Sequence, residues 1–267
     1  MPASDTAALL VPLETVMREA GELARATASG PFKRWTKGED KSPVSEGDIA
    51  VNNLLRARLP ALTPAAAWIS EETEHDPSAR SAPLSWIVDP IDGTRAYLAG
   101  RADWTISAAL VEQGRPLIAA LYAPVTDEMF LALRGQGATR NQARISVKPG
   151  GDLAGARLAG PKRTLERIAD LAPGVVLEPK VFSLALRLAR VAQGEFDAAF
   201  ASKGGHDWDV AAADLLVHEA GGALTDLAGQ PLRYNRPVLM HGALIAAGPA
   251  RHGALVDLVR DLSPEFA

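Results

Sequence analysis

The chain has no cysteine among its 267 residues. This excludes disulfide bridges, thiolate catalysis and cysteine-ligated zinc, together with the small secreted folds that depend on disulfides. The sequence also lacks an apolar run of the roughly 20 residues that a membrane-spanning helix needs. Its first residues do not form the basic segment followed by an apolar segment that is typical of a signal peptide. We therefore expect a soluble, cytoplasmic protein without a membrane partner.

An excess of positive charge is also absent. The formal net charge is −4 and the sequence pI is about 5.8. Proteins that bind nucleic-acid polymers usually present clustered Lys and Arg to the phosphates, so this class is disfavoured. A small phosphorylated metabolite remains possible as the partner, because a bound metal ion can make one site cationic in an acidic protein.

The order of the predicted elements changes near residue 150. Before it, helical periodicity covers residues 6–28, a second helix begins near Ser45, and apolar segments separated by turn residues indicate an antiparallel meander. After it, strands and helices alternate, as in an α/β arrangement. The predicted strands lie at 67–69, 85–88, 104–111, 116–122, 128–133, 157–159, 175–177 and 196–200, the later helices at 162–171, 182–193 and 207–220, and a polar loop at 37–43. The pattern predicts an α/β (α+β) protein with halves at 1–150 and 151–267.

Two of the predicted apolar strands run directly into acidic residues. Glu71 follows the strand at 67–69, and Asp89 and Asp92 follow the strand at 85–88. Functional side chains of α/β proteins gather beyond the carboxyl ends of strands, so we expect these carboxylates to meet. Carboxylates in one place ionise together only if cations compensate their repulsion. Ligation by oxygen alone favours Mg²⁺ or Mn²⁺ over zinc.

The segment after Asp92 is a candidate phosphate site. Gly93 and Thr94 are expected to begin a helical turn, whose exposed N–H groups suit an anion. A second interpretation of this segment remains open, because Asp is also favoured in turns and at helix N-caps. The same holds for Asp209, which taken alone is typical of a helix start. Residues 86–94 by themselves do not decide between a metal site and a capped turn.

Four segments, in this order, resemble the motifs of the inositol monophosphatase superfamily. They are residues 42–48 (SPVSEGD), 69–72 (ISEE), 86–94 (WIVDPIDGT) and 208–222 (WDVAAADLLVHEAGG). The resemblance implies a layered αβαβα sandwich of the inositol monophosphatase / fructose-1,6-bisphosphatase type. It also implies a Mg²⁺-dependent phosphate monoesterase that uses a metal-activated water, with two or three metal ions per site, Mn²⁺ as a substitute, inhibition by lithium and a homodimeric state.

The resemblance also implies roles for individual residues. Glu71, Asp89 and the carbonyl of Ile91 would hold one metal ion, and Asp89, Asp92 and Asp209 a second. Asp48, with Glu71, would orient the water shell of a weaker third ion, and Thr94 would help to activate the attacking water. The N–H groups of Gly93 and Thr94 would receive the phosphate. Glu72 follows Glu71 on an extended segment, so we expect its side chain to point the other way, where it either contacts the metal-ligating residues or lies at the surface. Lys37 lies either near the metals or in an exposed loop.

The residues after the midpoint favour one substrate class. Animal-type inositol enzymes have a Glu where this chain has Ser202, followed by Lys203, which weakens an inositol assignment. Residues 182–187 (FSLALR) are similar to the helix start of the 3′(2′),5′-bisphosphate nucleotidases, so Ser183 and Arg187 are candidate anchors for a second phosphate. Lys180, Lys203 and His206 are further candidates for substrate contact.

Other interpretations of the function stay open. Arg187 is also compatible with a solvent-facing helix position. Inositol monophosphatase is the alternative substrate assignment, followed by histidinol-phosphatase and sugar phosphatase. The alternative from another class is a metal-binding or phosphate-binding regulatory module without catalysis.

Overall fold

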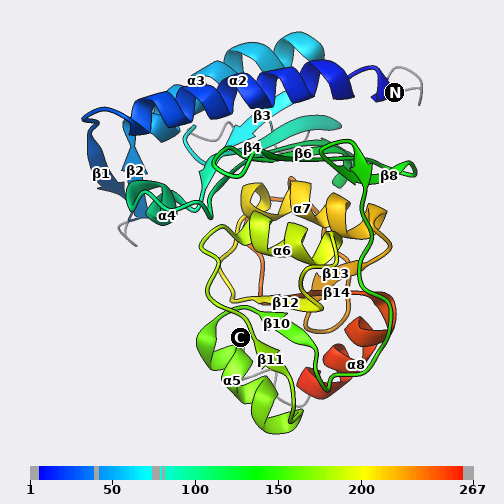
Figure 1. Ribbon diagram of the computed structural model, residues 1–267. Coiled ribbons are helices and arrows are strands. Elements are labelled where there is room, and N and C mark those ends of the chain that lie inside the picture. The colour runs from blue at the N-terminus through cyan, green and yellow to red at the C-terminus, as the bar shows by residue number, and fades with distance from the viewer. Residues whose placement is uncertain (1–5, 39–41, 74–78, 80–81, 261–267) are drawn as a thin grey trace.

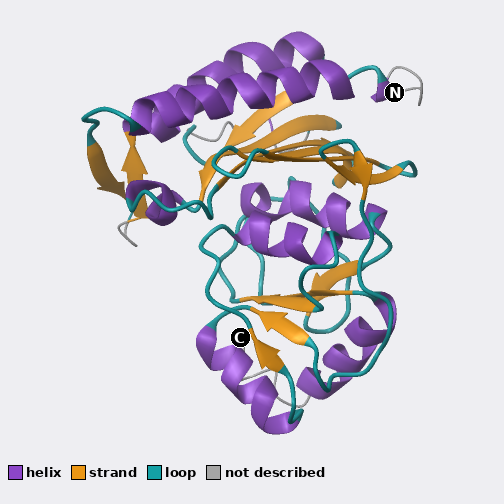
Figure 2. Ribbon diagram, in the orientation of Figure 1, coloured by secondary structure: helices purple, strands orange, loops and turns teal. Residues whose placement is uncertain are grey.

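The computed structural model describes residues 6–38, 42–73, 79 and 82–260, and it is built in five layers (Figure 1). From top to bottom in that view, a helix pair covers a large sheet, two further helices separate the large sheet from a smaller one, and two helices close the other face (Figure 2). This order of layers is the αβαβα sandwich that the sequence predicts. No described helix is long and apolar enough to cross a membrane.

The outer helix pair consists of α2 (Leu10–Ala28) and α3 (Glu46–Leu62). The apolar stripe of α2 is fully buried at Leu13, Met17 and Ala20, as its helical periodicity predicts. Ser45 caps α3, and the Asp48 side chain accepts from the backbone N–H of Ser45 in return. The cap therefore holds the Asp48 carboxylate at a defined place at the start of the helix.

The large sheet contains seven described strands in the order β3-β4-β5-β6-β7-β8-β9. Their bounds are Ala67–Ser70 (β3), Leu84–Asp92 (β4), Thr105–Glu112 (β5), Arg115–Ala123 (β6), Glu128–Leu133 (β7), Gly137–Arg140 (β8) and Ala143–Arg144 (β9). Only β3 and β4 pair in parallel, and the other pairs are antiparallel. Alternate side chains of β4 pack into two different hydrophobic cores. Trp86 and Val88 face the outer helices, and Ile87 faces the inner ones.

The smaller sheet has the order β11-β10-β12-β14-β13. Its bounds are Arg157–Ala159 (β10), Val176–Leu177 (β11), Ala198–Ala201 (β12), Ala223–Asp226 (β13) and Leu244–Ala247 (β14). The first three strands in chain order are parallel, and β14 runs antiparallel to its two neighbours. The remaining helices are α4 (Thr94–Leu98), α5 (Lys162–Leu171), α6 (Leu184–Ala192), α7 (Asp207–Glu219) and α8 (Pro249–Arg260).

Helix α7 lies between the two sheets (Figure 1), and this position explains its composition. Nearly all of its residues are buried, and three consecutive alanines, Ala211 to Ala213, allow backbone to approach backbone closely. A helix that is apolar on all sides is expected inside a protein rather than at its surface. The first turn of α7 therefore brings Asp209 to the interior, next to the large sheet.

The structure corrects the predicted loop at 37–43. Lys37 ends β1 (Arg34–Lys37) and Ser42 begins β2 (Ser42–Ser45), and these strands pair antiparallel beside α4. Their polar composition is explained by exposure, since most of β1 lies at the surface. Residues 39–41 of the predicted loop lie outside the described residues. The sequence patterns also did not predict β8, β9, β13, β14 and α8.

Candidate metal and phosphate site

Asp89 and Asp92 face the same cleft because β4 contains a bulge. In a regular strand, residues three apart point to opposite faces. Here Asp89 pairs with Ser107 and Asp92 with Thr105. Between these two pairs, β4 therefore contains one residue more than β5. An extra residue in one strand turns the side chains that follow it, and Pro90 is tolerated at such a position. Asp209, from the first turn of α7, completes the group: one carboxylate oxygen from each residue lies within 4.8 Å of the others.

The carboxylates of this group repel one another in a buried place. Burial, reinforced by Glu71, Asp92 and Asp209, raises the pKa of Asp89 well above its usual value. Burial and the charge of Asp92 raise the pKa of Asp209 to about 8. Without a cation, these groups do not all ionise at neutral pH. Three closely spaced carboxylates with no nitrogen or sulfur donor fit a hard divalent cation.

Glu71 reaches the same cleft from the end of β3. Its carboxylate lies 3.2 Å from Lys37 Nζ, and its backbone carbonyl accepts from the same ammonium group at 3.1 Å. Burial raises the pKa of Glu71, while the charge of Lys37 lowers it. Lys37 thus lies beside the acidic group rather than in an exposed loop. Of the two expected positions for Glu72, the structure favours the one next to the site, because its nearly buried carboxylate pairs with Lys37 at 2.5 Å.

Asp48 and Thr94 meet at the edge of the cleft. Thr94 Oγ1 lies 3.2 Å from Asp48 Oδ1 and 3.1 Å from the carbonyl oxygen of Ile91, so its single proton is shared between two acceptors. The other oxygen of Asp48 accepts from the N–H and the hydroxyl of Ser45, at 2.8 and 2.6 Å. Burial raises the pKa of Asp48 to about 6.

Asp92 is held by the start of α6. Its Oδ2 accepts from the Ser183 hydroxyl at 2.5 Å and from the Ala185 N–H at 2.7 Å. These hydrogen bonds and the positive end of the helix oppose the rise in pKa that burial causes at Asp92. Ser183 also contacts Thr105 Oγ1 at 3.0 Å and is fully buried. Its hydroxyl therefore orients Asp92 and does not face the cleft, contrary to the predicted substrate contact.

Gly93 stands at the turn between β4 and α4, where a side chain has no room. Its φ of +92° lies in the left-handed region that favours glycine. A Cβ atom there would lie 3.1 Å from the Ser183 nitrogen and 3.2 Å from the Asp103 carbonyl oxygen. The close approach lets the chain turn from the strand into Thr94, so that both residues line the cleft.

The cleft combines an acidic floor with a basic rim. It has a volume of about 570 Å³ and includes Glu71, Asp89, Asp92 and Asp209. Its cationic lining residues are Arg95, Lys180 and Lys203. The acidic floor suits metal ions, and the cations at the rim suit an anion that lies on them. Arg95 is a lining residue that the sequence patterns did not single out, although its position directly after Thr94 could have indicated it.

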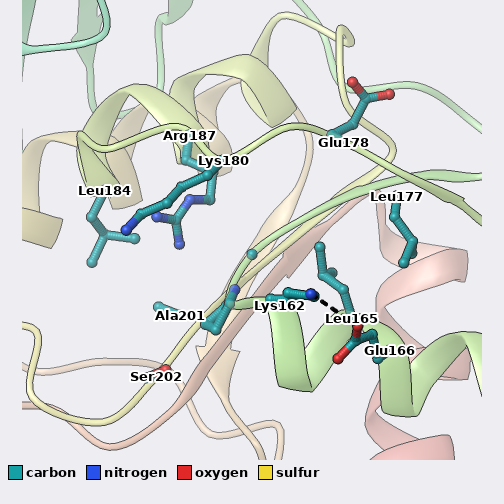
Figure 3. Close-up of a pocket in the computed structure, with 12 residues that line it drawn as sticks. Lys162, Leu165, Glu166, Leu177, Glu178, Lys180, Leu184, Arg187, Ala201 and Ser202 are labelled. Atoms are coloured by element: carbon teal, nitrogen blue, oxygen red, sulfur yellow. Dashed lines mark ion pairs between the residues drawn. The ribbon is translucent and has the colours of Figure 1, made fainter. Parts of the chain in front are cut away.

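A larger pocket adjoins the cleft (Figure 3). It has a volume of about 720 Å³, and Lys180 lines both spaces. Apolar side chains form much of its wall: Leu165, Leu177, Leu184 and Ala201. Figure 3 shows Lys180 and Arg187 approaching the same part of the pocket from two different segments. The pocket lies at the carboxyl ends of the parallel strands β10, β11 and β12, where α/β sheets bind ligands.

The comparisons with known proteins agree with this geometry. The model of the inositol monophosphatase family matches residues 5–263. The protein belongs to the inositol monophosphatase family. The 3′(2′),5′-bisphosphate nucleotidase CysQ of Aggregatibacter actinomycetemcomitans is 30% identical over 86% of this chain and 89% of that protein. Inositol monophosphatase 1 of Sus scrofa is 28% identical over 92% and 94%, and the Nus factor SuhB of Vibrio cholerae is 34% identical over 67% and 68%.

Solved structures place the fold in the same family. SuhB from Bartonella henselae superimposes with a TM-score of 0.82 at 26% sequence identity, over 95% of this chain and 98% of that one. An inositol monophosphatase from Thermotoga maritima gives 0.83 at 24% identity, over 95% and 97%. The predicted sandwich fold is thereby confirmed. As a member of this family, the protein is a phosphatase, and its substrate class is a small phosphorylated molecule.

Two candidate substrate residues of this inositol monophosphatase family member lie near the acidic floor but do not line the cleft. Arg187 donates through Nη1 to the carbonyl of Phe200 at 3.0 Å and through Nη2 to that of Val181 at 2.8 Å, while it lines the larger pocket. It is not solvent-facing, and its positive charge opposes the rise that burial causes in the pKa of Asp92. His206 stacks on Trp208 with ring centroids 4.6 Å apart. Its backbone N–H donates to Asp209 Oδ2 at 2.7 Å, which makes it the N-cap residue of α7.

Proposed function

We propose that this phosphatase uses Mg²⁺ and hydrolyses a 3′(2′),5′-bisphosphate nucleotide. The observation that carries the proposal is the acidic floor of the cleft joined, through Lys180, to a larger pocket with apolar walls. The floor accounts for the metal ions, and the pocket has the size of a small-molecule binding site. The CysQ relative, which covers most of the chain, supports the nucleotide as substrate.

In this proposal the acidic residues divide between two metal ions. Glu71, Asp89 and the carbonyl of Ile91 hold the first, and Asp89, Asp92 and Asp209 hold the second. Bound there, Mg²⁺ would polarise the phosphate of the substrate and make a water molecule more acidic. Mn²⁺ is the expected substitute, and Asp48 with Glu71 is the proposed place for a weaker third ion. Inhibition by lithium and a homodimeric state belong to the same proposal.

The chain's own residues position the reactants. Thr94 Oγ1 accepts the proton of the attacking water while its own hydroxyl proton passes to the Asp48 carboxylate, to which it is hydrogen-bonded. The N–H groups of Gly93 and Thr94 receive the phosphate that is cleaved, since the turn at Gly93 brings them to the cleft. Lys180 and Lys203 at the rim neutralise the negative charge of the substrate.

The alcohol part of the substrate is assigned to the larger pocket. A nucleoside has a flat apolar base and needs an apolar wall, which Leu165, Leu177 and Leu184 provide. Its second phosphate needs a second cation, and Lys180 and Arg187 approach the same part of this pocket (Figure 3). Inositol has no apolar face of this kind, and Ser202 offers no carboxylate for its hydroxyl groups.

The substrate assignment is tested by a comparison of kcat/KM on four esters at saturating Mg²⁺. These are 3′-phosphoadenosine 5′-phosphate, inositol 1-phosphate, histidinol phosphate and fructose 1,6-bisphosphate. We expect the nucleotide to be preferred by at least about tenfold, the discrimination that one good charged contact supplies. Preference for inositol 1-phosphate would establish the alternative that the Sus scrofa relative suggests.

A second candidate function follows from the relatives named Nus factor SuhB, which include the 34% identical protein of Vibrio cholerae. A role of that kind would not require turnover. Magnesium titration by calorimetry, together with phosphate release, separates the two. If the protein binds Mg²⁺ and releases phosphate from none of the four esters, a binding role replaces the proposed activity on them. If it binds no Mg²⁺, the metal assignment is wrong.

A further inference from the structure

One buried carboxylate, that of Asp207, binds both ends of a distant segment of the chain. Its Oδ2 accepts from the Asn235 backbone N–H at 2.7 Å, and its Oδ1 lies 2.8 Å from His241 Nε2. The side chain of Asp207 is 1% exposed and that of His241 is 10% exposed. We call residues 235–241 the strap. Both ends of the strap are thus bound to the side chain of Asp207, the first residue of α7. Asp207 lies two residues before Asp209.

The backbone of the strap also holds the segment that leads into α7. The N–H of His241 donates to the carbonyl of Gly205 at 2.7 Å, and the N–H of Gly204 donates to the carbonyl of His241 at 3.0 Å. The Asp207 N–H donates to the carbonyl of Leu239 at 2.8 Å. Residues 204–207 therefore pair with the strap in a short ladder, with no helix or strand of their own until α7 begins.

The segment that the strap holds forms part of the cleft wall. Lys203 and Gly204 line the cleft, and Asp209 belongs to its acidic floor. The strap itself does not line the cleft. At its other end it is tied to the large sheet, because the Asn235 side chain donates to Ser85 Oγ on β4 at 2.9 Å. The strap thus connects the strand that carries Asp89 and Asp92 with the segment that carries Lys203 and Asp209.

We propose that His241 and Asp207 are positioning residues that set the distance between Asp209 and the carboxylates of β4. The interaction closes the strap, the strap fixes residues 204–207, and these fix the first turn of α7. The proposal rests on the assignment of Asp209 as a metal ligand. It predicts that losing the His241 side chain weakens metal binding, although this side chain touches neither the metal ligands nor the cleft.

The alternative is that His241 and Asp207 are an ordinary buried pair that contributes to stability alone. The chain offers a matched control for this alternative. His252 is also a buried histidine, 8% exposed, whose Nε2 lies 2.9 Å from Thr225 Oγ1. It joins α8 to β13 and has no contact with the strap or the cleft. His252→Ala and His241→Ala each remove one buried histidine ring, whose partner is a hydroxyl at His252 and a carboxylate at His241.

The test measures Mg²⁺ affinity by calorimetry and melting temperature for the wild type, His241→Ala and His252→Ala. We expect a loss of Mg²⁺ affinity of about tenfold or more in His241→Ala, the size that is usual for residues that orient a metal ligand. We expect little change in His252→Ala at a similar loss of melting temperature. In His241→Gln, whose amide nitrogen reaches about the place of Nε2, we expect affinity to return toward that of the wild type.

The outcomes separate this proposal from the proposed function. If the wild type binds Mg²⁺ and His241→Ala binds it equally well, the positioning role is wrong and the metal site stands. Equal losses of affinity in the two alanine variants would also overturn it, because stability alone would then explain them. If His241→Ala does not fold, His241→Asn takes its place, since its shorter amide ends short of Asp207. Unchanged affinity in that variant has the same meaning.

Discussion

The carboxylates of Asp89 and Asp209 come from a strand end and a helix start, yet one oxygen of each lies within 4.8 Å of the other. Both pKa values are raised, mainly by burial and then by the charges of the neighbouring acids. A site of this kind destabilises the metal-free protein, because carboxylates that would ionise in solvent are kept together in the interior.

Asp89→Asn is expected to abolish turnover and to stabilise the metal-free protein. The amide removes one charge from the acidic floor, and with it a donor that the proposal assigns to both metal ions. We expect the melting temperature in chelator to rise by roughly 2–4 °C, which corresponds to about 1 kcal/mol for a chain of this length. Asp170→Asn, at an exposed position on α5, is the control and should leave both properties unchanged. Magnesium-dependent turnover in Asp89→Asn would contradict the metal assignment.

Removal of metal should reverse the usual dependence of stability on pH. The pKa of Asp48 rises to about 6 and that of Asp209 to about 8, so the folded state holds these protons more tightly than the unfolded state. The contribution of these two groups to stability is then greatest below their unfolded pKa near 4, and it is lost as pH rises through 6 and 8. We expect the chelated protein to melt at a higher temperature at about pH 5 than at about pH 8.5.

Excess Mg²⁺ should raise the melting temperature more at the higher pH, because it binds the ionised carboxylates. The measurement is a thermal melt at both pH values, with chelator and with Mg²⁺. An equal gain from Mg²⁺ at both pH values would mean that the acidic floor is not the site of binding.

Ser183→Ala should weaken metal binding and leave the KM for substrate nearly unchanged at saturating Mg²⁺. The Ser183 hydroxyl donates to Asp92 and is buried behind it, so its loss frees Asp92 to turn. We expect Mg²⁺ affinity to fall by about tenfold, as is usual for a group that orients a metal ligand. The opposite result, a raised KM with unchanged Mg²⁺ affinity, would restore the direct substrate contact that the sequence suggested.

Lys180→Ala and Arg187→Ala should differ, although both residues line the larger pocket. Lys180 ends in the shared region of the two cavities, and its loss should reduce kcat/KM for a bisphosphate more than for a monophosphate. Arg187 holds the carbonyls of Val181 and Phe200, so its loss should also cost about 1–3 kcal/mol of stability. The loss of substrate preference is measured as kcat/KM on a bisphosphate and on a monophosphate. The loss of stability is measured by denaturant-induced unfolding. Equal losses on both esters in Lys180→Ala would remove the argument for a second anion.

Much of the site could be predicted because its chemistry lies at the ends of elements that sequence patterns reveal. Apolar strands that run into Glu71 and into Asp89 and Asp92 already indicate carboxylates at one edge of a sheet. The helix starts at Ser45 and before Asp209 follow from capping preferences and helical periodicity. With the four family motifs, these local patterns predicted the fold, the phosphatase activity and the acidic residues of the cleft.

Other features depend on what packs against these elements, which local patterns do not contain. The bulge that turns Asp92 toward Asp89 depends on the pairing of β4 with β5. The burial of Ser183 depends on where the start of α6 packs against β4. The sequence places Asp207 only at the start of the helix at 207–220, because its partners, Asn235 and His241, lie far along the chain. The sequence by itself determined which acids could meet and what ion they would favour. Only the tertiary structure decided which side chains face the cleft and which stabilise the segments around it. The reason is that the direction of a side chain depends on the segments that pack against it.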